Sequence, residues 1–457
     1  MKYLLKNGLI VTPSGVVKGD ILISNGLIQA IGNCLWDESA VIFDVEDNYI
    51  FPGLIDSHVH IAHPNKYGNA TDDFYTASVA AAKSGVTMFM DFAIQWDQSD
   101  DIYKTAVKKD AQIKKESIID YSFHNCPTLS EPITLSPMED LENEGLPSFK
   151  FYMTYSRQNR MASDGLLLEA LKKSREYNCI VGVHAENDSM ILYNEKVAEA
   201  ANEINYAYFP KYKPPYIEEE AINRVIQMNE TARGNLFVFH VTTGNGAAMI
   251  KKAREAGQSI YAETCVHYLV LDDDKYLQND GYKYLCSPPL RGKKDRDDLW
   301  KALNNNTLSI VTSDHCGFSY ITKENNKDDF RNIPNGLPGI DTRLSVLYTE
   351  GVVKGRISME KMVEVTSTNA AKIFGCFPQK GIIQVGSDAD LVVFNPRHQR
   401  LFSNKELSGS TDWSPYEGMD LHGKVEMTFS RGELIVENDE VRAVPGRGNR
   451  VVRKLNL

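Results

Sequence analysis

Short apolar runs of strand-like composition alternate with longer segments of helical spacing between residues 49 and 381. This alternation is typical of a parallel sheet whose two faces are covered by helices. Eight runs are predicted to be strands, ending near His60, Phe92, His124, Met153, His184, His240, Glu263 and Asp314. Eight strands predict a closed (β/α)8 TIM barrel of the α/β class. The alternative, an open doubly wound sheet, predicts a glycine-rich phosphate loop after its first strand, and the sequence has none there.

The two ends of the chain have the alternating pattern of antiparallel strands. Residues 4–11 and 19–32 alternate apolar and polar side chains around the hairpin signal Asn25-Gly26, and the same pattern returns after Gly381. We therefore predict a small β-sandwich domain from residues 1–48 and 382–440, a barrel from residues 49–381, and a C-terminal tail, residues 441–457, that could lie at an oligomer contact.

Composition excludes several classes of protein. Of the 457 residues, 42% are hydrophobic and 24% charged, as in ordinary globular proteins. The formal net charge of -11 argues against a nucleic-acid partner, and the basic residues Arg447, Arg450, Arg453 and Lys454 are predicted to lie in a solvated terminus. The seven cysteines form no CxxC pair and are expected to be reduced. Without a signal-like or membrane-length segment, the chain is predicted to be cytoplasmic, with no membrane partner.

Four histidines occupy positions suited to metal binding. His58 and His60 are two residues apart, so in a strand both face one way while Val59 faces the other. An HxH pair alone is weak evidence, because surface histidine pairs are common. His184 and His240 each end an apolar run, where a single histidine would be interpreted as a core residue bonded to backbone. Together the four favour a metal site.

Two charged residues extend this set. Asp314 ends the last predicted strand, where an unpaired carboxylate is costly unless a cation or several donors offset it. Lys150 lies among aromatic residues, where burial lowers the amine pKa and a neutral amine can add carbon dioxide to form a carbamate. The alternative interpretation of Lys150 is a lysine whose amine extends to solvent from a strand edge. Nitrogen and oxygen donors of this kind suit zinc, with manganese, cobalt or iron as alternatives, and two ions fit better than one.

Several motifs resemble the cyclic amidohydrolases, specifically dihydropyrimidinases and bacterial D-hydantoinases, over nearly the whole chain. The HxH segment and Gly386-Ser-Asp-Ala-Asp-Leu391 are shared with the wider amidohydrolase superfamily. The more specific motifs are Ser148-Phe-Lys-Phe-Tyr-Met-Thr-Tyr155, Cys286-Ser-Pro-Pro-Leu-Arg291 and Pro334-Asn-Gly-Leu-Pro-Gly339.

The resemblance implies a ring-opening hydrolase with two zinc ions per subunit. His58, His60 and Asp314 would hold one ion, His184 and His240 the other, and carboxylated Lys150 would bridge them. A hydroxide between the ions would open 5,6-dihydropyrimidines or 5-substituted hydantoins to N-carbamoyl amino acids. Asp314 would act as general base and then acid, Tyr155 would stabilise the oxyanion, and the backbone at Ser287 and Asn335 would bind the ring amide. A homotetramer or homodimer is expected.

Two segments depart from the hydantoinase pattern. Residues 61–65 read Ile-Ala-His-Pro-Asn, which puts the preferred ring substituent in doubt, and residues 262–269 are closer to allantoinases and dihydroorotases. An allantoinase- or dihydroorotase-like hydrolase is therefore an alternative. A non-catalytic scaffold is another, but the complete set of six metal positions disfavours it. His63 is expected to be a loop residue, and His315, facing away from Asp314, is expected to have a structural role.

Overall fold

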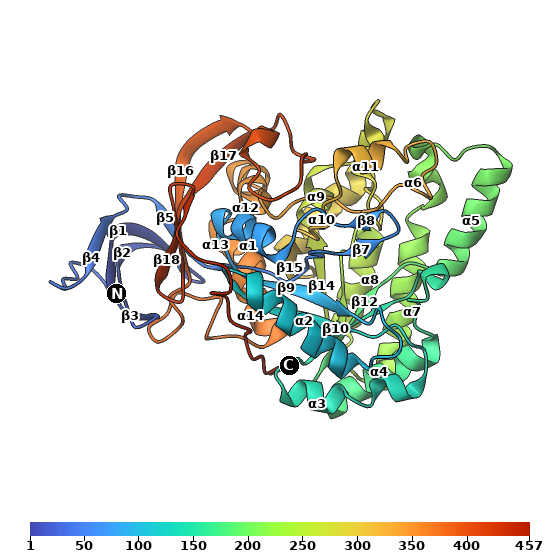
Figure 1. The fold of residues 1–457 in the computed structure, drawn as a ribbon, viewed down its shortest axis with the longest axis horizontal. Coiled ribbons are helices and arrows are strands. Elements are labelled where there is room, and N and C mark those ends of the chain that lie inside the picture. The colour runs from blue at the N-terminus through green and yellow to red at the C-terminus, as the bar shows by residue number, and fades with distance from the viewer.

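The computed structural model describes residues 1–457, except for the side chains of Asn65 and Pro132. A barrel wrapped by helices forms the larger part of the molecule, and strands from both ends of the chain form a separate sheet beside it (Figure 1). The predicted fold class, a TIM barrel with a β domain built from the two termini, is confirmed.

Eight parallel strands form the barrel wall. In chain order they are β6 (Leu54–Asp56), β9 (Val86–Ile94), β10 (Asp120–Cys126), β11 (Ser148–Tyr152), β12 (Ile180–His184), β13 (Leu236–Val238), β14 (Ile260–Cys265) and β15 (Ile310–Thr312), and each pairs with the next. A parallel bridge between Val59 and His315 joins the first strand to the last, and the His60 amide donates to the His315 carbonyl at 2.7 Å. All residues of β9 to β12 are buried, as expected of strands covered on both faces.

Helices follow most of these strands and lie outside the barrel (Figure 1). The longer ones are α1 (Phe74–Lys83), α2 (Ile102–Glu116), α4 (Asp164–Glu176), α5 (Asp188–Ala200), α7 (Tyr216–Ala232), α8 (Gly244–Glu255) and α10 (Lys293–Asn304). Shorter helices are α3 (Met138–Asn143), α6 (Phe209–Tyr212), α9 (Val266–Val270), α11 (Tyr320–Glu324), α12 (Arg343–Leu347), α13 (Met359–Val363) and α14 (Asn369–Phe374). Side chains that cap helix starts fix several of them: Asp101 accepts from the Lys104 amide at 2.7 Å, an interaction worth about 1 kcal/mol.

The sheet beside the barrel combines both ends of the chain. Its strands are β1 (Tyr3–Thr12), β2 (Gly15–Ser24), β3 (Leu27–Gly32), β4 (Val41–Asp44), β5 (Tyr49–Pro52), β16 (Leu391–Leu401), β17 (Asp420–Ser430), β18 (Glu433–Glu437) and β19 (Glu440–Val441). Asn25 and Gly26 form the predicted turn between β2 and β3, with φ of 53° and 82°, and glycine adopts such angles without strain. β5 pairs with both β1 and β16, so it joins the two ends.

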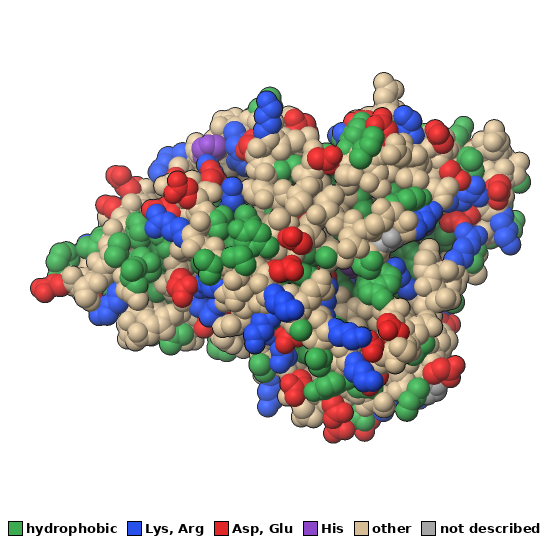
Figure 2. All heavy atoms as spheres, in the orientation of Figure 1, with side chains coloured by type: hydrophobic (Ala, Val, Ile, Leu, Met, Phe, Trp, Pro, Cys, Tyr) green, Lys and Arg blue, Asp and Glu red, His purple; other side chains and the backbone are tan. Residues whose placement is uncertain are grey.

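Apolar side chains gather on the outer part of this sheet (Figure 2). Val16, Val17, Ile31, Val41 and Ile42 are all exposed. Over the rest of the viewed face, basic and acidic side chains are interspersed. Among the described residues, no helix has the length and hydropathy needed to cross a membrane.

The C-terminal tail packs against its own barrel. The Tyr121 amide donates to Asn449 O at 3.0 Å, and Arg453 donates to Phe123 O at 2.7 Å and to Ser148 Oγ at 2.9 Å. The prediction of a solvated terminus is wrong for Arg453, which is 1% exposed. Its guanidinium satisfies a backbone carbonyl inside the barrel, and residue type alone does not reveal such a contact.

Three barrel strands end earlier than the sequence predicts. β6 ends at Asp56, β13 at Val238 and β15 at Thr312, before His60, His240 and Asp314. His240 and Asp314 have φ of 39° and 46°, in the left-handed region that interrupts a β ladder. Turns beyond the strand ends therefore orient these two side chains.

Candidate metal centre and catalytic cavity

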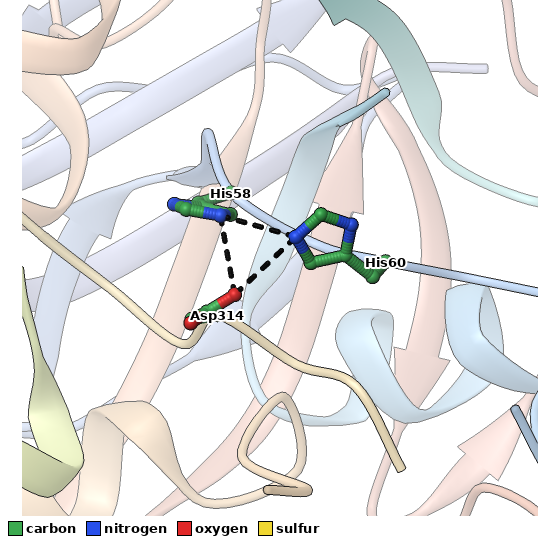
Figure 3. Close-up of side chains that lie close together, drawn as sticks. All are labelled: His58, His60 and Asp314. Atoms are coloured by element: carbon green, nitrogen blue, oxygen red, sulfur yellow. Dashed lines mark hydrogen bonds and ion pairs between the residues drawn. The ribbon is translucent and has the colours of Figure 1, made fainter. Parts of the chain in front are cut away.

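Three of the predicted metal ligands meet at the carboxyl end of the barrel (Figure 3). His58 Nε2 lies 3.1 Å from Asp314 Oδ1 and 3.3 Å from His60 Nε2, and His60 Nε2 lies 3.5 Å from Asp314 Oδ1. His58 and His60 face the same side, and Val59, fully buried, faces the hydrophobic core. One atom from each of the three residues could therefore contact a single ion.

The hydrogen bonding of His58 favours a cation at this point. His58 Nδ1 contacts Glu263 Oε1. If Nδ1 carries the ring proton and donates it to Glu263, Nε2 is left with a lone pair. This lone pair, the Asp314 carboxylate and His60 Nε2 converge within hydrogen-bonding distance. Convergence of electron pairs is repulsive unless a positive charge lies between them. A carboxylate behind a metal-binding histidine is also the usual arrangement that fixes its tautomer.

His184 and His240 form the second part of the centre. Their ring centroids are 4.4 Å apart, and His240 lies 5.5 Å from His58 by the same measure. His184 Nε2 lies 2.7 Å from Glu186 Oε2, which leaves Nδ1 for a ligand. Lys213 Nζ donates to the same Glu186 oxygen at 3.2 Å. Both His58 and His184 therefore have a buried carboxylate on the nitrogen opposite the proposed ion.

Lys150 extends from β11 into the same space and is 1% exposed. Its Nζ lies 3.8 Å from the centroid of the Phe239 ring and 5.0 Å from that of Phe92. Among the described side chains, the structure gives it no ion-pair partner. Burial lowers the pKa of Lys150 to about 8, although Asp314 and Glu263 oppose the shift. A substantial neutral fraction is therefore available near neutral pH for reaction with carbon dioxide.

Asp314 is the acidic group of the cavity. Burial raises its pKa to about 7, and the opposing attraction of Lys150 only partly offsets this shift. A carboxyl group of this pKa can both accept and return a proton near neutral pH. His240 and Asp314 have positive φ without being glycine, and such backbone strain is concentrated at functional sites.

The predicted substrate residues line one cavity of about 90 Å³ with the metal-binding groups. Its described lining includes His60, Lys150, Tyr155, His184, His240, Ser287, Asp314 and Asn335. The Tyr155 ring centroid is 5.2 Å from that of His184, and burial raises the pKa of Tyr155, so its hydroxyl keeps its proton and can donate. Ser287 Oγ donates to Glu186 at 2.8 Å.

His63 and His315 have different environments. His63 lines the catalytic cavity, its ring 5.2 Å from His60 and 5.3 Å from Trp96 by centroid. His315 lies away from the cavity: its Nε2 is 3.1 Å from Asp72 Oδ2, and its Nδ1 accepts from the Gly339 amide at 3.2 Å. His315 therefore connects the last strand to neighbouring loops.

Several residues of the centre have no place in the sequence analysis. Glu186 lies two residues after His184 and bonds to its ring, so this spacing could have revealed it. Lys213, which donates to Glu186, and Arg160, which lines the cavity, come from loops, and no sequence pattern places them there. Only the folded structure identifies these two.

The sequence and the fold are both similar to those of known proteins. The sequence profile described as Amidohydrolase family matches residues 49–435. A D-hydantoinase of Geobacillus stearothermophilus is 38% identical, with 99% of this chain and 97% of that protein covered. The crystal structure of dihydropyrimidinase from Brevibacillus agri NCHU1002 superposes with a TM-score of 0.96 at 38% identity, covering 99% of each chain. D-hydantoinase from Bacillus sp. AR9 gives 0.97 at 37% identity, covering 100% of each chain. The chain belongs to the amidohydrolase family.

Proposed function

We propose that this protein hydrolyses cyclic amides, opening 5,6-dihydropyrimidine or 5-substituted hydantoin rings to N-carbamoyl amino acids. The observation that carries the proposal is the convergence of His58, His60 and Asp314. The last two of these line one cavity together with Lys150 and Tyr155. The relatives named D-hydantoinase and dihydropyrimidinase support the substrate class.

The donor set fits two divalent cations, and zinc is the proposed metal. His58, His60 and Asp314 would hold one ion and His184 and His240 the other, while Lys150, as a carbamate formed with carbon dioxide, would supply oxygens to both. When bound, the cations would lower the pKa of a water molecule and polarise the scissile carbonyl.

The chain's own residues would bind the ring and move the protons. Asp314 accepts the proton of the attacking water and delivers it to the leaving ring nitrogen. Tyr155 donates its hydroxyl proton in a hydrogen bond to the carbonyl oxygen as negative charge develops there. The backbone at Ser287 and Asn335 holds the amide edge of the ring.

A turnover panel on zinc-loaded protein tests the proposal. Dihydrouracil and 5-substituted hydantoins should be opened, and mass spectrometry should detect the N-carbamoyl amino acids. Allantoin or dihydroorotate as the preferred substrate would instead favour the relationship suggested by residues 262–269. A pure sample that binds no metal and opens no ring would favour a non-catalytic scaffold.

The proposal also covers the oligomeric state of the protein and its location in the cell. We expect a homotetramer, or failing that a homodimer, in the cytoplasm. Light scattering coupled to size-exclusion chromatography measures the first property, and fractionation of the source cells measures the second.

A further inference from the structure

Arg160 lies at the edge of the catalytic cavity. It lines this cavity together with Lys150, Tyr155 and His63. Its guanidinium carbon is 4.0 Å from the centroid of the Trp96 ring, a stacked arrangement that holds the group in place. The Arg160 amide also donates to Tyr155 O at 3.2 Å, which ties its backbone to the proposed oxyanion donor.

Arg160 differs from the neighbouring cations in having no carboxylate. Lys109 pairs with Asp91 at 2.7 Å, and Lys213 pairs with Glu186 at 3.2 Å. Among the described residues, Arg160 has no ion-pair partner, and its buried Nε has no hydrogen-bond acceptor. A guanidinium is always protonated and presents five donors. The cavity edge therefore holds a fixed positive charge with unused donors.

The remaining lining of the cavity leaves this charge available to a ligand. Asp314 is the one acidic residue among the described lining residues, and it lies with the metal-binding histidines. On the other side, His63 also borders a second cavity of about 310 Å³, which Trp96 lines as well. The carboxylates of this second cavity are Asp97, Asp91 and Asp100, and the last two pair with Lys109 and Lys108. A ring bound at the metal centre would thus have space for a short substituent beside the Arg160 guanidinium.

We propose that Arg160 selects cyclic amides whose ring substituent ends in a carboxylate. The inference rests on the proposed function and specifies its substrate. A carboxylate accepts two parallel N–H bonds from a guanidinium, and such charge-assisted pairs are the strong ones among protein hydrogen bonds. A neutral amide of the same shape has one carbonyl oxygen and no negative charge, so it can accept only one of these two N–H bonds, and that bond is not charge-assisted. The substituent, rather than the reacting ring, is what Arg160 recognises.

A matched pair of substrates tests the inference: hydantoin-5-acetate and its neutral isostere hydantoin-5-acetamide, each assayed with the zinc-loaded protein. The wild type should favour the acid in kcat/KM by about 10- to 100-fold, the range expected for hydrogen bonds to a charged group. Arg160→Met should remove this preference, mainly by raising KM for the acid, and leave the amide within about threefold of wild type. Arg160→Lys should retain part of the preference, because it keeps the charge but loses the planar pair of donors.

Arg157→Met is the matched control. Arg157 lies three residues earlier, is exposed, and pairs with Glu195. It should leave both substrates unaffected. Two results would overturn the inference: an equal loss of kcat/KM on the acid and the amide in Arg160→Met, or a wild type that does not prefer the acid. If unsubstituted hydantoin is still opened in these assays, the proposed function itself stands. A metal-loaded wild type that opens neither dihydrouracil nor any of the three hydantoins would overturn the proposed function itself, and this inference with it.

Discussion

Two buried lysines at different places in the molecule have opposite environments. Lys150, 1% exposed at the catalytic cavity, lies over aromatic rings, and burial lowers its pKa to about 8. Lys380, 2% exposed where the barrel meets the sheet, donates to Asp120, Asp388 and Asp390 at 2.8, 2.9 and 2.6 Å. Burial alone would lower the pKa of Lys380, but the three carboxylates outweigh it and raise that pKa.

The difference shows how a buried charge can be assigned a role. A cation surrounded by carboxylates is already neutralised, so it connects elements of the fold. A cation without such partners is costly to bury, and it persists where chemistry requires it. By this reasoning we propose that Lys380 stabilises the fold and that Lys150 belongs to the catalytic centre. Substitutions at both positions can test the assignment.

Lys150→Ala should have the largest effect on activity. Without the carbamate the paired ions lose their common ligand, and we expect kcat/KM to fall by about 10³-fold or more, equivalent to about 4 kcal/mol. Metal analysis should show a loss of bound zinc, and added acetate or propionate should partly restore both properties. The free energy of unfolding of the metal-free protein should change little, because an unpaired charge has been removed. A variant that keeps two ions and normal turnover would exclude the carbamate.

Lys380→Met should destabilise the fold without altering the chemistry. It leaves three carboxylates close together, two of them fully buried, and breaking a buried pair of this kind costs about 3 to 5 kcal/mol. Urea denaturation of metal-free protein measures the loss. At a temperature where the variant remains folded, its kcat should match that of the wild type. A large fall in kcat with unchanged stability would reverse the roles assigned to the two lysines.

Tyr155→Phe should keep both ions and lose most of the rate. Removing one oxyanion donor typically costs about 2.7 to 4 kcal/mol of transition-state stabilisation. The fall should be seen in kcat more than in KM, because the hydrogen bond strengthens in the transition state. Zinc content serves as the control, and activity equal to that of the wild type would remove Tyr155 from the mechanism.

Asp388→Asn should have the smallest effect. Asp388 is the most exposed of the three carboxylates around Lys380, and Asp120 and Asp390 remain to pair with the amine. We expect a loss of about 1 kcal/mol in the free energy of unfolding, comparable to one hydrogen bond. A loss as large as that of Lys380→Met would mean that Lys380 stabilises the fold only when all three carboxylates are present.

The sequence by itself determined the architecture and the main candidates for the centre. Strand and helix periodicities are local properties, so they predicted the eight-stranded barrel, and the Asn25-Gly26 turn followed from backbone chemistry. The spacing of His58 and His60 placed both rings on one side for the same local reason.

The tertiary structure alone decided which charges are compensated. Residues distant in the chain decide that Lys150 lacks a carboxylate and that Lys380 has three. They also decide that Arg453 donates to Phe123 O and that Arg160 lines a cavity. Electrostatic energy depends on separation in space and on burial, and neither quantity is encoded in the local pattern of side chains.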